Sequence, residues 1–486
     1  MTATLAADAE PSAQCALWRS ASTTMTLSSA RFTLASGVLR NSALAEAVRA
    51  LRAKVDDVAR RGTLGGEGIR RVEVEFAGAD PLAFLAAQRP GARAYVRGRD
   101  GVMAIASVGT AASFGSADDP AFQAMRDAEP RLIGILSQRF DSGRESGAEW
   151  RGFSAASVRV PAVELRREAG RTTIGATVVG DGAATRAALA RVESGESPTD
   201  PHGLAPEFAP GFGADEGVNS SLSAWKIAVD ATLAEIEAGP VRKIVLARTR
   251  TFRLGEDADP CELLLRLGEN EPGTYQFLIE DAPGVSFLGA SPERLFQRTG
   301  NKLLSEAIAG TRPRGETPAR DQHLVESLFA SEKDRHEHQL VLDQILEKLA
   351  PVVASIRFAR YPRLLRLANV QHLCSPVDAE LREGVSDGEL LARLHPTPAV
   401  CGQPVERART IIRACEPFDR GLYAGPVGII GATTDVCVAI RSALLVGSTV
   451  TAFAGAGVVA GSNAESEWRE TEHKLATFER VVAARG

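Results

Sequence analysis

The order of predicted strands and helices constrains the fold of this chain more than any other sequence feature. Segments with apolar residues at every second position, typical of half-buried strands, recur at Val72–Phe76, Ala94–Gly98 and Thr173–Val178. Strands and helices then follow each other in runs, without the strict alternation that marks a doubly wound parallel sheet. We therefore expect an α+β fold built on antiparallel sheets.

The composition fits a globular protein and excludes several other classes. The chain has 486 residues, of which 44% are hydrophobic, and it is long enough to bury a large core without crosslinks. No apolar run reaches the roughly 18 residues that cross a bilayer, so we expect no membrane segment. The net charge of −5 argues against nucleic acid as a partner. The six cysteines show no zinc-site spacing, and we interpret them as reduced thiols of a cytoplasmic protein.

Residue composition divides the chain into three segments. Residues 1–30 are rich in Ala, Ser and Thr and lack a secretory signal pattern, so we expect a flexible N-terminal tail. Residues 31–215 form an N-terminal half without a recognisable chemical motif, and loop-forming residues at 194–213 mark its end. Residues 216–486 carry the segments that point to a functional site.

Lysine is rare in this chain, and its positions are therefore informative. Only seven of the 56 basic residues are lysine. Lys243 opens the predicted strand Lys243–Phe252, where it shares a face with Val245 and Ala247. A lysine that loses hydration on an apolar face is more readily neutral and can act as a base, which an arginine cannot. The alternative is a lysine at a strand end that extends to water.

Two predicted helices each place a pair of carboxylates, three residues apart, in line with an apolar stripe. Asp334 and Glu337 form one pair, and Glu467 and Glu470 form the other. Two inward-facing acid pairs would repel each other, and a hard cation such as Mg²⁺ would remove that cost. The alternatives are a solvated face for the first pair and a favourable helix N-terminus for the second.

Segments rich in glycine and proline are predicted to form loops that position a ligand. Phe453–Gly461 precedes a predicted helix, where glycines let backbone N–H groups approach an anion, although its spacing does not match a phosphate loop. Arg441 is a candidate bidentate partner for a carboxylate. Ala309–Gly315 and Leu394–Pro404 are likewise expected to be loops. His372 is either a structural histidine or a group whose charge is easily tuned.

Several of these segments together resemble the chorismate-utilising enzymes, the family of isochorismate, salicylate, anthranilate and aminodeoxychorismate synthases. The resemblance rests on motifs that follow the family's order between about residues 222 and 486: Gly289–Leu295, Ala309–Gly315, Ser331–His338, Ala454–Gly457 and Glu467–Thr471. It implies a large two-layer antiparallel β-sandwich flanked by helices. Family members typically carry a divergent N-terminal half of the kind seen here.

The resemblance also implies a metal and a substrate. Mg²⁺ would be held by Glu337 and Glu470, with Asp334 and Glu467 supporting it through water. The substrate would be chorismate. Its expected contacts are Gly310, Thr311, Ala399, Tyr423, Arg441, Gly455, Gly457 and Lys474.

Within the family, the resemblance is closest to isochorismate synthase. Ammonia-using members usually carry glutamine at the position of Lys243, whereas lysine marks the members that add water. Lys243 would deprotonate water for attack at ring carbon C2, and Glu293 would protonate the departing C4 hydroxyl. His372 is a third catalytic candidate. The segments His395–Gly402 and Phe418–Gly428 also match the isochorismate type.

Three alternatives differ in what they do with chorismate. A salicylate synthase would share this site and go on to eliminate pyruvate. An ammonia-using synthase would need an amidotransferase subunit, which we do not expect here. A non-catalytic regulator should have lost the base, the acid or the metal carboxylates, and all are present. We expect a monomer whose product feeds quinone synthesis or siderophore and salicylate synthesis.

Overall fold

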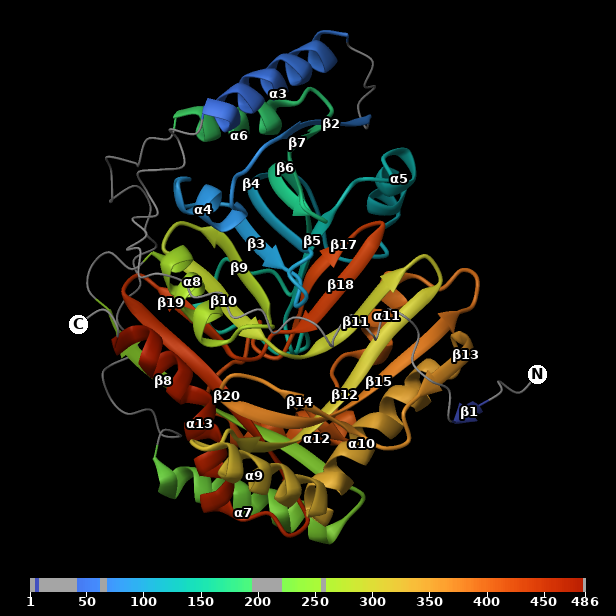
Figure 1. Cartoon of the computed structure of the whole chain (residues 1–486), viewed down its shortest axis with the longest axis vertical. Helices are drawn as coiled ribbons and strands as arrows, with labels where there is room; N and C mark the ends of the chain where they lie inside the picture. The colour runs from blue at the N-terminus through green and yellow to red at the C-terminus, as the bar shows by residue number, and fades with distance from the viewer. Residues whose placement is uncertain (1–4, 8–41, 62–67, 195–220, 255–258, 484–486) are drawn as a thin grey trace.

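The strands join into one hydrogen-bonded and almost entirely antiparallel sheet that folds into two layers (Figure 1). The computed structural model describes residues 5–7, 42–61, 68–194, 221–254 and 259–483. The predicted tail, apart from Leu5–Ala7, and nearly all of the predicted loop at 194–213 lie outside these residues. The α+β class and the antiparallel sandwich expected from the sequence are confirmed.

The first layer contains strands from both halves of the chain. In pairing order it consists of β2 (Ile69–Phe76), β7 (Arg171–Val179), β6 (Ala156–Glu168), β4 (Met103–Phe114), β3 (Arg93–Arg97), β9 (Tyr275–Ala282), β10 (Val285–Ser291), β19 (Ser442–Val446), β20 (Thr449–Val459), β8 (Lys243–Arg253) and β16 (Gly402–Gln403). Three strands of this layer, β2, β3 and β7, were predicted from period-two patterns, and β8 is the predicted strand that begins at Lys243.

The second layer is hydrogen-bonded to the first through β6. The second half of β6 pairs with β7, whereas its first half pairs with β5. From there the order is β5 (Gly134–Gln138), β17 (Pro426–Ile430), β18 (Thr433–Val438), β11 (Arg294–Thr299), β12 (Lys302–Pro313) and β15 (Val370–Leu381), with β13 (Val353–Phe358) and β14 (Arg363–Arg366) paired to β15. β1 (Leu5–Ala7) adds a parallel pairing to β13.

Helices cover the outer faces of this sheet. In Figure 1, α3 (Ser42–Arg60) and α6 (Ala183–Ser194) lie at one end of the molecule, and α7 (Leu222–Ala238), α9 (Pro318–Ala330), α10 (Glu332–Leu349), α12 (Val405–Cys415) and α13 (Ala464–Ala483) lie toward the other. The remaining helices of the described residues are α4 (Pro81–Ala86), α5 (Pro120–Ala128), α8 (Pro260–Asn270), α11 (Asp387–Leu394) and a 3₁₀ turn at Ala148–Trp150. Across the described ranges, no helix is both long and apolar enough to cross a membrane.

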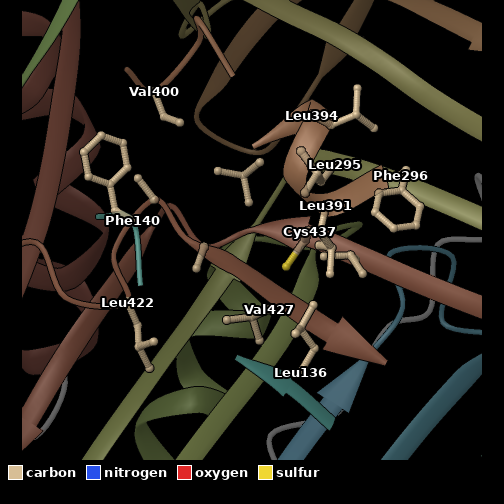
Figure 2. Packing of buried hydrophobic residues seen from close by; sticks show 14 of the residues in the cluster. Leu136, Phe140, Leu295, Phe296, Leu391, Leu394, Val400, Leu422, Val427 and Cys437 are labelled. Carbon is tan, nitrogen blue, oxygen red and sulfur yellow. The ribbon is translucent and has the colours of Figure 1, made fainter. Parts of the chain in front are cut away.

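The alternation of side chains along each strand divides the apolar residues between two cores. On β3, Ala94 and Val96 enter the core between the layers, whereas Tyr95 enters a second core beneath the outer helices. Figure 2 shows part of the inter-layer core, where Leu136 of β5 and Val427 of β17 lie close together. The N-terminal half thus completes the same core as the half that carries the motifs.

Two of the predicted loops are strands instead. Phe453–Val459 belongs to β20, where Gly455 pairs with Ala247 and Gly457 with Val245 of β8, so the glycines do not precede a helix N-terminus. Ala309–Pro313 belongs to β12, which is interrupted by a register shift at Gly310. In these strands the glycines allow other groups to approach the backbone closely and allow the bulge in β12. A strand can need a residue without a side chain for these purposes just as a loop can. Leu394–Pro404 is largely irregular, as predicted.

Candidate active site

Lys243 is the first residue of β8 and is completely buried. Its side chain stays on the inner side of the strand with Val245 and Ala247, so the alternative of a lysine that extends to water is wrong. The Lys243 Nζ atom lies 2.8 Å from Oε1 of Glu337. The rare lysine of the sequence is therefore a buried cation held by a carboxylate of a neighbouring helix.

Glu337 reaches Lys243 from the first turns of α10. Ser331 caps this helix, because its hydroxyl accepts a hydrogen bond from the N–H of Asp334. The ion pair passes directly over Gly457 of β20. A Cβ atom at Gly457 would lie 2.6 Å from Oε1 of Glu337 and 2.9 Å from Cε of Lys243. Glycine is needed here because any side chain would collide with both partners.

The carboxylates of α13 are also paired with lysines. Glu467 is buried and bonded to Nζ of Lys333 at 2.5 Å, and Glu470 is bonded to Nζ of Lys474 at 2.6 Å. Lys474 also donates to the carbonyl of Gly455 at 2.8 Å. Burial and the nearby charge of Glu470 raise the pKa of Glu467. The pKa of Glu470 is lowered because Lys474 outweighs the opposing effect of burial.

Asp334 completes the set of four carboxylates on the two helices. Its Oδ2 atom accepts a hydrogen bond from Arg312 of β12 at 2.7 Å. In the described part of the chain, no three His, Cys, Asp or Glu side chains stand close enough to enclose a metal ion. Instead each of the four carboxylates is paired with a cation of the chain. Burial lowers the pKa of Lys333, but three of these carboxylates outweigh that effect and raise it: Glu467, Glu337 and Glu470.

Glu293 follows β10 and is only 5% exposed. Its Oε1 atom accepts a hydrogen bond from the hydroxyl of Thr397 at 3.3 Å. Burial is the main reason that the pKa of Glu293 is raised to about 7. A carboxyl group in this state can hold a proton at neutral pH and deliver it.

His372 faces the same region from β15 and is neutral. Its Nδ1 atom lies 3.1 Å from the hydroxyl of Thr311 and 3.3 Å from the carbonyl of Gly310. Burial, with Arg441 and Lys474 nearby, lowers its pKa to about 3. Its Nε2 atom is buried and has no hydrogen-bond partner among the described residues. His372 can therefore accept a hydrogen bond from a ligand.

Arg441 is the cation of this site that is not matched by a carboxylate. It is 6% exposed and adopts a left-handed backbone with φ of 50°. Among the described residues, its guanidinium has no hydrogen-bond or ion-pair partner, in contrast to Lys243, Lys333 and Lys474. A nearly buried arginine without a partner is suited to a carboxylate of a ligand.

Tyr423 stands beside the glycines of β20. Its ring stacks on Phe453 at a centroid distance of 5.0 Å, and its hydroxyl oxygen would lie 3.0 Å from a Cβ atom at Gly455. Burial raises the pKa of Tyr423 to about 12, so the hydroxyl stays a neutral donor. Ala399 is partly buried in the loop before β16 and is placed near the site only through its neighbour Thr397.

The charges of these side chains act on one another, as expected for groups that surround one region. The pKa of Glu293 responds to Lys243 and Lys474, and that of His372 responds to Arg441 and Glu470. Sequence reasoning missed the partners Arg312, Lys333 and Thr397. All three lie in segments that carry the resemblance, but only Lys333 carried a further signal, as one of the few lysines. The pairing of Arg312 and Thr397 depends on strand and loop packing.

Comparisons with known proteins identify the family of this chain. Residues 58–483 match the family model described as chorismate binding enzyme. The chain is 35% identical to isochorismate synthase 2, chloroplastic, of Arabidopsis thaliana over 71% of this chain and 63% of that protein. It is 34% identical to the salicylate biosynthesis isochorismate synthase of Pseudomonas aeruginosa over 74% of this chain and 75% of that one. The chain thus spans less than two thirds of the plant relative.

Solved structures share the fold. The structure of MenF, the menaquinone-specific isochorismate synthase from Escherichia coli, superposes with a TM-score of 0.74 at 26% identity and covers 89% of this chain and 99% of its own. Anthranilate synthase component I from Streptococcus pneumoniae shares the fold with a TM-score of 0.53 at 18% identity, covering 85% of this chain and 92% of its own. The match to the family model extends over most of the sequence and includes every residue of the site described above. The chain therefore belongs to the chorismate binding enzyme family.

Proposed function

We propose that this protein is an isochorismate synthase, which converts chorismate to isochorismate. The observation that carries the proposal is the pair formed by Lys243 and Glu293. One is a buried lysine held in the site by Glu337, and the other is a buried carboxyl group with a pKa of about 7. A base and an acid within one site are what the exchange of one hydroxyl position for another requires.

The proposed reaction adds water at C2 and removes the hydroxyl at C4. The neutral amine of Lys243 takes a proton from a water molecule as the water oxygen bonds to C2, and the ring double bond shifts. The ammonium formed is the partner of Glu337. The C4–O bond breaks, and the departing hydroxyl leaves as water with the proton of Glu293. One water enters and one leaves, so chorismate and isochorismate are isomers and the reaction is reversible.

The substrate carboxylates would be bound by groups that the chain leaves available. Arg441 supplies a buried guanidinium that no residue of the described ranges pairs with, and the hydroxyl of Tyr423 is a neutral donor. Lys474 already contacts Glu470 and the carbonyl of Gly455 and keeps a third donor. The unpaired Nε2 atom of His372 can accept from a substrate hydroxyl. Gly455 and Gly457 leave space on β20 for the hydroxyl of Tyr423 and for the Lys243–Glu337 pair.

The donor set also fits Mg²⁺, which we propose as the cofactor. Mg²⁺ takes oxygen ligands and usually needs only one or two carboxylates, with water and substrate completing its shell. Glu337 and Glu470 would hold it, and Asp334 and Glu467 would support it through water. Bound there, the ion would neutralise the substrate's C1 carboxylate. The lysines that pair with these carboxylates keep the acids of α10 and α13 compatible with partial burial.

The test is product analysis with purified protein, chorismate and Mg²⁺, with and without ammonium. Isochorismate without stoichiometric pyruvate is the expected result. Salicylate with equal pyruvate would mean that the site continues to the elimination step, and an amino product that needs ammonium would refute water as the nucleophile. Lys243→Ala should abolish turnover while chorismate binding changes only a few-fold. A collapse of binding would mean that Lys243 holds substrate instead.

The names of the relatives support a proposal for the destination of the product. Their names include menaquinone-specific and salicylate biosynthesis enzymes. We propose that this chain supplies isochorismate to quinone synthesis or to siderophore and salicylate synthesis, without an amidotransferase subunit. The five cysteines in the described ranges are free thiols, which supports a reducing, cytoplasmic location.

A further inference from the structure

The turn that carries Glu293 is held at each of its backbone polar atoms. The N–H of Glu293 donates to the hydroxyl of Ser291 at 3.2 Å, and its carbonyl accepts from the N–H of Val438 at 3.0 Å. One further backbone atom is hydrogen-bonded on each side of Glu293. The carbonyl of Pro292 accepts from Nη1 of Arg99 at 2.7 Å, and the N–H of Arg294 donates to Oε1 of Glu306 at 3.2 Å.

Arg99 and Glu306 are themselves an ion pair. The Arg99 guanidinium binds both carboxylate oxygens of Glu306, with Nη2 at 2.9 Å from Oε2, and both side chains are buried. Arg99 lies in the turn between β3 and β4, in the half of the chain without motifs, whereas Glu306 lies in β12. One buried pair thus joins the N-terminal half to the two peptide units that flank Glu293.

The same pair places a fixed charge near the Glu293 carboxyl. Although burial opposes it, Arg99 and Arg294 keep the pKa of Glu306 below its usual range, so Glu306 is an anion. After burial and the opposing bond from Thr397, this anion is the next influence on the pKa of Glu293, which it raises. The other groups that face Glu293 are Lys243 of β8, Lys474 of α13, and the neutral Tyr423 and Cys437.

We infer that Arg99 and Glu306 are positioning residues for the acid of the reaction: they fix the turn that carries Glu293 and set the charge beside it. This inference rests on the proposed function. It gives the N-terminal half, which carries no motif, a defined part in the chemistry. We do not place either residue in contact with the substrate. Both act on Glu293 indirectly, through hydrogen bonds to its turn and through the electrostatic field at its carboxyl group.

Three variants separate position from charge. Arg99→Met removes the bonds and the positive charge, so the anion of Glu306 should raise the pH midpoint at which Glu293 loses its proton. Glu306→Gln keeps the shape and removes the anion, so the midpoint should fall. Arg99→Lys keeps the charge but cannot hold Glu306 and Pro292 with the same planar fork, so kcat should fall about 10- to 100-fold with little change of the midpoint.

The control is Arg93→Met, in the strand that leads to Arg99. Arg93 is equally buried, pairs with Glu280 through Nη2 and Oε2 at 2.7 Å, and binds the carbonyls of Leu85 and Gln88. Its loss should lower the melting temperature in the manner of Arg99→Met. It should leave the kcat–pH profile of isochorismate formation in place, because Arg93 does not contact the Glu293 turn.

Two measurements decide the inference. The first is kcat and KM for chorismate against pH. The second is an infrared titration of the protonated carboxyl band, assigned to Glu293 by its loss in Glu293→Gln, which needs no turnover. Opposite shifts of the pH midpoint of Glu293 in Arg99→Met and Glu306→Gln support the inference. Equal midpoints in the wild type, Glu306→Gln and Arg99→Met overturn it. A midpoint that shifts in Arg93→Met as it does in Arg99→Met also overturns it. If Arg99→Met does not fold, Glu306→Gln and Arg99→Lys still decide.

A wild type that binds chorismate but forms no isochorismate refutes the proposed function instead. The infrared midpoints would then still test whether Arg99 and Glu306 change the pH at which Glu293 loses its proton.

Discussion

Replacement of Gly457 by alanine tests whether the Lys243–Glu337 pair must occupy its present position. Ordinary contacts of a Cβ atom begin near 3.4 Å, and the new atom would lie 2.6 Å from Oε1 of Glu337, so the carboxylate must move by about 0.8 Å. The pair stands at 2.8 Å, and this displacement costs about 1 kcal/mol of attraction at an effective dielectric constant of about 20. The effect on stability should therefore be small.

The effect on catalysis should be larger, because a displacement of roughly 1 Å of a catalytic group costs on the order of 10²-fold in rate. We expect kcat for isochorismate formation to fall about 100-fold in Gly457→Ala, with a melting temperature within a few degrees of the wild type. The control is Gly115→Ala, since Gly115 is exposed, lacks a positive φ and has no atom within 4 Å of a built Cβ. A Gly457→Ala protein that keeps kcat within two-fold would refute the assignment of this pair to the reaction.

Three further predictions concern the acid, the substrate and the metal. Because Glu293 has a raised pKa of about 7 and acts in its protonated form, kcat should fall as pH rises through 7. The folded protein binds this proton more tightly than the unfolded chain, so the resulting stabilisation is lost as pH rises from about 4.5 toward 7. In Glu293→Gln the melting temperature should depend less on pH over this range. Arg441→Gln should weaken chorismate binding about 10- to 100-fold in calorimetry, with an unchanged melting temperature because no described residue pairs with the guanidinium; unchanged binding would exclude Arg441 as the carboxylate site. Glu470→Gln should raise the Mg²⁺ concentration needed for activity and for calorimetric binding at least tenfold, and an unaltered Mg²⁺ titration would reject the metal assignment.

The sequence was most informative where a residue type was costly or unusual for its surroundings. Lys243 stood out because lysine is rare and because its strand is apolar, and the structure buries it completely. The carboxylates of α10 and α13 stood out because they interrupt apolar stripes, and both helices turn those residues toward the site. Period-two patterns likewise identified β2, β3 and β7, since a strand with one buried face must alternate.

Features that depend on long-range packing were not predictable in the same way. The glycines of β20 were assigned to a loop because glycine composition alone does not distinguish a turn from a strand that another group approaches closely. Their partners, Glu337 and Tyr423, come from distant segments. Arg99 gave no signal at all, because one arginine in a turn looks the same in sequence whether it reaches solvent or a buried carboxylate such as Glu306.

The pairing of cations with carboxylates also explains the unusual use of lysine. Lys243, Lys333 and Lys474 each bind a carboxylate of α10 or α13, whereas the structural ion pairs elsewhere, such as Arg99–Glu306 and Arg93–Glu280, use arginine. An arginine fork holds two oxygens of one partner and stays charged, which suits a permanent crosslink. A lysine is a compact point charge that neutralises one oxygen and leaves the other available. For the Mg²⁺ site and the base proposed above, lysine suits both needs, because it leaves a carboxylate oxygen available and, unlike arginine, can lose its proton. Asp334, which pairs with Arg312, is the exception among the four carboxylates.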